Sequence, residues 1–204
     1  MKVRIVLDIA CAWSALGWTR FEHAVERFRA EGGEADVEFL PFQVAPDAPA
    51  EGEPLSAVHR RVFGPTVEAK TARMAALAAR SGLEMNFDAA VFANTLDAHR
   101  LLARAVAQGQ GERTVGRLFR AYFTEGLNVA DPAVLERIAR ESGVAPGALP
   151  GPDPVAAGQR IVRELGVTSV PVFLFDGGPT LVGAQSEEDL LAALREAAVN
   201  GSLV

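Results

Sequence analysis

The stretch VRIVLDIACAWS, residues 3–14, decides how this chain folds. Residues 3–7 are apolar except for Arg4 and rich in β-branched side chains, which predicts a buried strand that runs directly to Cys11. From residue 12 to 30 the apolar positions follow a helical period, and Gly32-Gly33 ends the pattern. Residues 37–44 predict a second strand. We therefore expect a βαβ unit whose helix begins at Cys11.

Further along the chain, helical patterns dominate before strands return. Prolines at 46, 49 and 54 mark a loop, and no strand is predicted from about 56 to 143, where His59 lies in a stretch without pattern. Helices are predicted over 66–80, 95–108, 112–124, 132–141, 154–165 and 187–198. A hairpin is predicted from the strand 172–175, the turn 176–178 and the strand 179–182. The expected order is β-α-β, a helical block, then α-β-β-α.

Composition and charge exclude several classes of function. The 204 residues carry 20 basic and 26 acidic side chains, a net charge of −6, which argues against a nucleic-acid partner. No apolar run reaches the ~18 residues of a membrane span, and Asp8 comes too early for a signal-peptide core. We expect a cytoplasmic protein without a membrane partner.

Cys11 is the only cysteine, which excludes an internal disulfide and a multi-thiolate metal cluster. The three histidines lie too far apart for metal-ligand spacing, so no metal is predicted. At a strand-to-helix junction, unpaired N–H groups and the helix dipole favour a thiolate, with pKa values of roughly 3.5–7.5 against about 8.5 for a free thiol. Cys11 is therefore a candidate nucleophile, and a small buried apolar residue is the alternative.

Val170-Pro171 precedes the strand 172–175. An X-Pro bond there can be cis and can expose the backbone of Val170 to an extended substrate. The alternative is an ordinary proline at the first residue of a strand.

These features together resemble the thioredoxin superfamily and, within it, the DsbA-like group that includes FrnE-type disulfide oxidoreductases. The matching residues are 8–14, Asn94-Thr95, Ala98-His99-Arg100, 118–126, 128–131, Val170-Pro171 and Gly183-Ala184-Gln185, spread over nearly the whole chain. The resemblance implies an α/β thioredoxin fold, built from residues 1–45 and 154–204 and interrupted by an all-helical insertion of residues 46–153. It also implies that Cys11 attacks the substrate and that Pro171 is the cis-proline facing it.

The active-site motif departs from that family. Relatives with full disulfide-exchange activity carry Cys-Pro-Trp-Cys, whereas this chain has Cys11-Ala12-Trp13-Ser14. Because a mixed disulfide needs a second thiolate for its release, Ser14 prevents resolution within the chain. We expect a thiol-disulfide oxidoreductase with one nucleophilic cysteine and no tightly bound cofactor, and with an external thiol such as glutathione as resolving partner. Ser14 either donates a hydrogen bond to the Cys11 thiolate or is an inert remnant.

Two other functions remain open. Kappa-class glutathione transferases and 2-hydroxychromene-2-carboxylate isomerases share the inserted helical block, and their glutathione-activating serine corresponds to Cys11. A glutathione-dependent isomerase or transferase of an aromatic molecule is therefore the first alternative. The second is a catalytically degenerate module that binds peptides.

Candidate substrate-binding residues surround this motif. Trp13 is expected to shield Cys11, and Val170 to pair with the substrate backbone. His99 and Arg100 are candidates to bind a substrate carboxylate, with a solvated helix face as the alternative. Gln185 is a candidate contact for glutathione or a peptide, with a plain turn as the alternative. The resemblance also makes a homodimer plausible.

Overall fold

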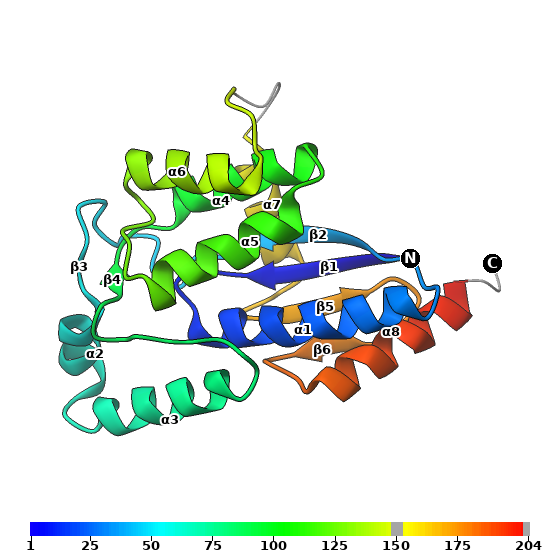
Figure 1. Cartoon of the computed structure of the whole chain (residues 1–204), viewed down its shortest axis with the longest axis horizontal. Coiled ribbons are helices and arrows are strands. Elements are labelled where there is room, and N and C mark those ends of the chain that lie inside the picture. The colour runs from blue at the N-terminus through cyan, green and yellow to red at the C-terminus, as the bar shows by residue number, and fades with distance from the viewer. Residues whose placement is uncertain (148–152, 202–204) are drawn as a thin grey trace.

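A four-stranded sheet forms the centre of the molecule in a computed structural model that describes residues 1–147 and 153–201. Its strands are β1 Lys2–Leu7, β2 Asp36–Pro41, β5 Val172–Phe175 and β6 Thr180–Val182. They lie in the order β2-β1-β5-β6, with β1 parallel to β2 and antiparallel to β5 (Figure 1). The structure confirms the predicted α/β thioredoxin fold.

Helices cover both faces of this sheet. α1 Ala12–Ala30 and α8 Glu187–Gly201 pack together on one face, and α7 Pro154–Glu164 packs against β2 on the other (Figure 1). The apolar stripe of α1 explains its position, because Phe21 stacks on Phe173 of β5 and both rings are buried. The sheet and these helices place the end of β1 and the start of α1 at one edge.

The segment between β2 and α7 is mainly helical, as predicted. It contains α2 Leu55–Phe63, α3 Val67–Ala79, α4 Leu96–Ala107, α5 Gly111–Phe119, the π-helical turn η1 Arg120–Thr124 and α6 Pro132–Ser142. The sequence pattern missed α2. It was also wrong to exclude a strand, because β3 Glu53–Pro54 pairs with β4 Val91–Phe92. Two-residue strands are too short for any alternation to be visible.

The helix boundaries follow the capping residues. Asp131 and Asp153 accept hydrogen bonds from the N–H groups of Ala133 and Val155, at 2.8 and 2.9 Å, and start α6 and α7. Gly143 ends α6 with a positive φ of 76°. These signals act locally, which is why the helices predicted over 132–141 and 154–165 begin where α6 and α7 begin.

One continuous apolar core joins the two parts of the chain. It includes Phe21 and Phe173 from the sheet region and Leu101, Leu118 and Phe123 from the helical segment. The division into residues 1–45 with 154–204 and residues 46–153 stays a prediction.

Among the described residues, no helix combines the length and the apolar character that crossing a membrane requires.

Candidate active site at the start of α1

Cys11 is the residue before α1, as the sequence predicts. Its backbone is extended, with φ −94° and ψ 113°, and its carbonyl accepts the N–H of Ala15 at 3.0 Å. The side chain is half-buried. Its sulfur therefore lies beside the first N–H groups of the helix, which have no partner within the helix.

The loop that faces Cys11 contains Val170 and Pro171, and the peptide bond between them is cis. The Cys11 thiol donates to the carbonyl of Val170, with Sγ and O 3.7 Å apart. Gly17 permits this approach, since a Cβ there would lie 2.8 Å from Pro171 Cγ. The structure thus brings together Cys11 and the Val170-Pro171 segment, which are 159 residues apart in the chain.

Burial raises the pKa of the Cys11 thiol above its ordinary value. The Ser14 hydroxyl and the N–H groups of Ser14 and Trp13 act in the opposite direction and lower the pKa, whereas the charge of Asp8 raises it. The prediction of a lowered pKa is therefore wrong for the free protein. Desolvation outweighs the donors at the helix start, and the resting group is a thiol.

Ser14 is fully buried one helical turn after Cys11. Its hydroxyl oxygen accepts the N–H of Asp8 at 3.4 Å, and the hydroxyl also stabilises a negative charge on Cys11. Whether Ser14 donates a hydrogen bond to the Cys11 thiolate or is an inert remnant stays a prediction.

Asp8 and His99 form a buried polar pair behind Cys11. Nε2 of His99 lies 3.4 Å from Oδ1 of Asp8 and 3.0 Å from the carbonyl of Phe42. Since Phe42 offers only an acceptor, Nε2 carries a proton. The other carboxyl oxygen of Asp8 accepts the N–H of Val44 at 2.7 Å.

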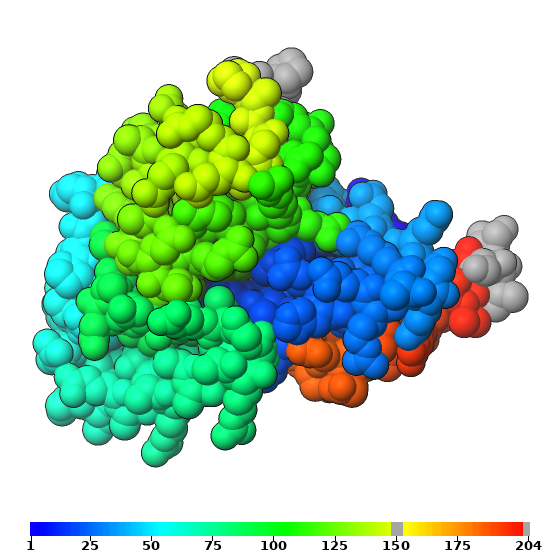
Figure 2. Space-filling view, in the orientation of Figure 1, coloured from blue at the N-terminus to red at the C-terminus, as the bar shows by residue number. Residues whose placement is uncertain are grey.

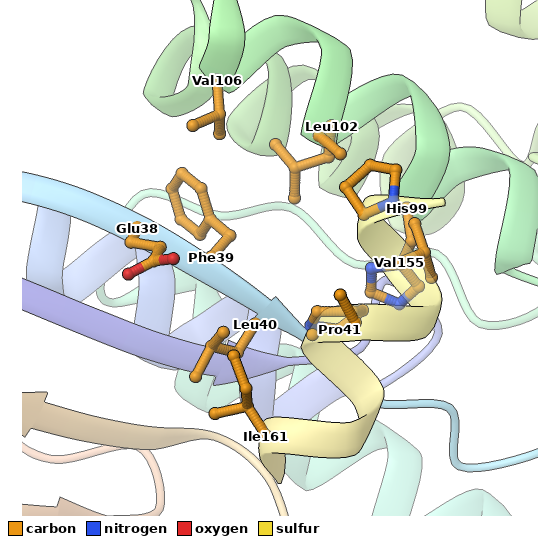
Figure 3. A pocket seen from close by; sticks show the side chains of 13 residues that line it. Glu38, Phe39, Leu40, Pro41, His99, Leu102, Val106, Val155 and Ile161 are labelled. Atoms are coloured by element: carbon orange, nitrogen blue, oxygen red, sulfur yellow. The ribbon is translucent and has the colours of Figure 1, made fainter. Parts of the chain in front are cut away.

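His99 also lines a mainly apolar cavity of about 300 Å³ between β2, α4 and α7 (Figure 3). Its ring lies at one end of the cavity, among the side chains of Pro41 and Val155. His99 is only 3% exposed, and its polar contacts are with Asp8 and Phe42.

Arg100 lies on the opposite, exposed side of α4. It forms ion pairs with Asp97 at 2.8 Å and with Asp153 at 3.1 Å. The prediction that His99 and Arg100 act together on a substrate carboxylate is therefore wrong. Adjacent residues on a helix point in different directions, and here one points into the core and the other to the surface.

The remaining predicted residues lie at the surface near the loops of the site. Trp13 is 52% exposed, which is a position suited to contact with a substrate rather than to packing. Gln185 folds back on its own loop, where its amide donates to the carbonyl of Val182. Its backbone carbonyl accepts from Arg20, which also holds the carbonyl of Ala184. The substrate contacts of these residues stay predictions.

Sequence reasoning missed two groups of this site, Asp8 and Tyr122. Asp8 is an acid that directly follows an apolar strand, and that pattern is a usable signal for a buried carboxyl group. Tyr122 is fully buried and its hydroxyl has no hydrogen-bond partner among the described residues. Burial and the charge of Asp8 raise its pKa far above the ordinary value. No sequence pattern indicates that Tyr122 lies near Asp8.

The described residues hold no group of three His, Cys, Asp or Glu side chains arranged as a metal site.

Comparisons with known proteins agree with this geometry. The probable DsbA oxidoreductase of Streptomyces coelicolor superposes with a TM-score of 0.84 at 30% identity, covering 97% of this chain and 89% of that one. The cytosolic disulfide reductase DsbM of Pseudomonas aeruginosa, solved with glutathione, gives 0.65 at 20% identity, covering 100% and 98%. A 2-hydroxychromene-2-carboxylate isomerase gives 0.68 at 14% identity, covering 100% of both chains. At these lower identities the last two show the fold alone.

The family match extends over almost the whole chain. Residues 2–195 match the DSBA-like thioredoxin domain, whose members act on thiol and disulfide substrates, and the finer FrnE-type assignment stays a prediction. The cysteine at the start of α1, the cis-proline loop beside it and this match lead to one conclusion: the chain belongs to the DSBA-like thioredoxin domain family.

Proposed function

We propose that this protein catalyses thiol-disulfide exchange through Cys11 alone, with glutathione as the external resolving thiol. The observation that carries the proposal is the position of the only cysteine at the start of α1, with its sulfur 3.7 Å from the carbonyl of Val170. Ser14 occupies the place of a second cysteine, so the chain has no thiol of its own for resolution.

The first chemical step is attack of the Cys11 sulfur on the glutathione sulfur of a mixed disulfide, RS–SG. A bond forms between Cys11 and glutathione, the RS–SG bond breaks, and RS⁻ leaves and takes up the proton that Cys11 lost. In the second step a glutathione thiolate attacks the bound glutathione sulfur. Oxidised glutathione leaves, Cys11 regains a proton, and the sum is RS–SG + GSH → RSH + GSSG.

Substrate binding can itself activate the thiol. In the free protein the carbonyl of Val170 accepts the thiol hydrogen and so stabilises the neutral form. An extended substrate that donates its own N–H to this carbonyl competes for that acceptor. The Ser14 hydroxyl and the N–H groups of Ser14 and Trp13 remain to stabilise the thiolate.

The comparison with DsbM supports the choice of glutathione and of the cytoplasm as the compartment, because that protein is a cytosolic disulfide reductase solved with glutathione. A reducing compartment supplies the external thiol that the Cys-x-x-Ser motif requires.

The test measures reduction of the mixed disulfide of glutathione and 2-mercaptoethanol, with glutathione as reductant and oxidised glutathione as the product followed. The wild type is compared with Cys11→Ser, and intact-protein mass spectrometry follows the glutathione adduct. We expect turnover and an adduct only where Cys11 is present.

Three outcomes would contradict the proposal. Equal turnover by Cys11→Ser would show that Cys11 is not the nucleophile. No turnover by either protein, with saturable glutathione binding that persists in Cys11→Ser, would favour the glutathione-dependent isomerase or transferase. An unreactive Cys11 thiol together with no glutathione binding would favour the catalytically degenerate module that binds peptides.

A further inference from the structure

A second cavity lies beside α1, where this helix meets the helical segment. It measures about 320 Å³ and is enclosed by α1, the loop of residues 81–84, α5 and the turn η1. Figure 2 shows this face, where the blue surface of α1 meets the green residues of the helical segment. The volume is within the range of about 300–1,000 Å³ that is typical of small-molecule sites.

Trp18 presents an unpaired donor at this cavity. Its side chain is only 1% exposed, and its indole Nε1–H has no hydrogen-bond partner in residues 1–147 and 153–201. A buried Trp usually finds an acceptor for this group, because an unpaired buried donor is destabilising. An acceptor supplied from outside the chain would remove that cost.

Glu22 lies one helical turn after Trp18 and is also unpaired. Its carboxyl group is half-buried and forms no hydrogen bond or ion pair with the described residues. Burial raises its pKa, as do the charges of Glu26 and Glu112, whereas Arg120 and His23 lower it. A half-buried acid of this kind is stabilised by a cation or by a strong donor.

The other polar groups of the wall mostly have partners. Thr124 donates to the carbonyl of Glu84 at 2.7 Å, Ser81 accepts from Arg20 at 3.2 Å, and His23 is 2.9 Å from Glu187. The exposed guanidinium of Arg120 and the exposed carboxyl group of Glu84 are the exceptions, and neither forms an ion pair within the described part of the chain.

Gly116 keeps the space in front of the two unpaired groups open. A Cβ at this position would lie 3.3 Å from Nε1 of Trp18 and 3.7 Å from Oε1 of Glu22. Glycine inside a helix is less favourable than alanine. Gly116 does not have the positive φ that would require glycine. The absence of a side chain here instead leaves space in front of Trp18 and Glu22.

We propose that this cavity binds a zwitterion of the α-amino-acid type. Its ammonium group faces Glu22, and its carboxylate accepts from the indole N–H of Trp18 and from Arg120. Leu83 and Phe119 provide apolar wall for a side chain. The site is separate from Cys11, because the groups that contact the ligand come from Trp18 and Glu22 of α1 and from Arg120 of η1.

The test uses L-leucine as the probe, with two analogues that each lack one charged group. Isopentylamine lacks the carboxylate and 4-methylpentanoic acid lacks the amine. The protein contains two tryptophans, so a Trp13→Phe background reports the fluorescence of Trp18 alone, and calorimetry measures affinity independently. We expect saturable binding of L-leucine and at least about tenfold weaker binding of both analogues.

Two variants locate the site. Glu22→Gln is expected to weaken L-leucine binding at least about tenfold. Gly116→Ala is expected to abolish it without lowering the melting temperature, because alanine favours the helix while its Cβ fills the space before Trp18. Exposed Glu34→Gln is the matched control, and Cys11→Ser tests independence from the exchange reaction. Both should bind as the wild type does.

Absence of saturation by L-leucine at 10 mM, on the order of the weakest affinities of specific sites, would overturn the proposal. Equal binding of the two analogues, or unchanged binding by Gly116→Ala, would also overturn it. None of these outcomes bears on thiol-disulfide exchange, which has its own assay.

Discussion

Cys11 and Asp8 lie three residues apart, yet the two sides of this junction are built differently. Cys11 meets solvent, the first N–H groups of α1 and the carbonyl of Val170. Asp8 is 1% exposed and contacts His99 of α4 and the backbone at Val44. We call the side of the junction at Cys11 the outer side and the side at Asp8 the inner side. The outer side is therefore formed mainly by the thioredoxin-like elements, and the inner side mainly by the helical segment.

This difference shows how one cysteine can be subject to two opposing influences. The donors of the outer side stabilise a thiolate, whereas burial and the charge of Asp8 on the inner side favour the thiol. In the free protein, burial and the charge of Asp8 outweigh these donors, so the pKa of Cys11 is raised. The following experiments remove single contributions from one side or measure which side controls the pKa of Cys11.

The largest effect is expected from Cys11→Ser, which removes the nucleophile. We expect reduction of the mixed disulfide to fall by more than about 100-fold, as for other nucleophile deletions. The far-UV circular dichroism spectrum should stay unchanged, because the two side chains are similar in size. Turnover by Cys11→Ser that falls by less than about 100-fold would show that the exchange reaction does not need the sulfur of Cys11.

The pH profile of Cys11 alkylation in the wild type shows whether the outer or the inner side controls the pKa of Cys11. Because the folded-state pKa of Cys11 is raised, the thiolate is scarce at pH 7 and the iodoacetamide rate should climb through pH 8.5 and above. A thiol with a pKa of 8.5 or more reacts at least about 30-fold more slowly at pH 7 than its thiolate does. A plateau below pH 7.5 would mean that the outer side dominates.

Ser14→Ala removes the strongest of the outer donors to Cys11. We expect the pKa of Cys11 to rise further and the alkylation rate at pH 8 to fall about tenfold, which corresponds to one pKa unit. The two rates should converge only at a pH above both pKa values. An unmoved midpoint would show that Ser14 is an inert remnant.

Asp8→Asn removes the inner charge and leaves an oxygen for the N–H of Val44. The pKa of Cys11 should fall, and alkylation at pH 7 should speed up about threefold, half a pKa unit. Exposed Asp36→Asn is the matched control and should leave the profile unchanged. A slower reaction would mean that Asp8 stabilises the thiolate instead.

Tyr122→Phe tests the inner side with the smallest expected effect. Because its hydroxyl is buried without a partner among the described residues, its removal should change the free energy of unfolding by no more than about 1 kcal/mol, in the stabilising direction. Urea denaturation measures this change. A loss of more than about 1 kcal/mol would reveal a partner, such as a bound water, that the hydroxyl needs.

The residues of the outer side could largely be predicted, whereas those of the inner side could not. Cys11 at the end of a strand and Val170-Pro171 before a strand are local sequence patterns. The resemblance to the thioredoxin superfamily predicted that the two face each other. His99 and Arg100 were predicted together because the resemblance places their helical block against the active-site face, but only the packing of α4 shows that one is buried and the other exposed. The unpaired groups at Trp18 and Glu22 likewise depend on α5, which is distant in sequence.

By itself, the sequence determined the α/β architecture, the helix caps, the family and the lack of a second cysteine. These features depend on periodicity, capping residues and residue identity, which are local properties. Only the tertiary structure decided the direction of the Cys11 pKa shift and the placement of Asp8 beside His99. Desolvation and charge-charge interactions depend on what packs around a group, and here those neighbours come from α4, η1 and the cis-proline loop.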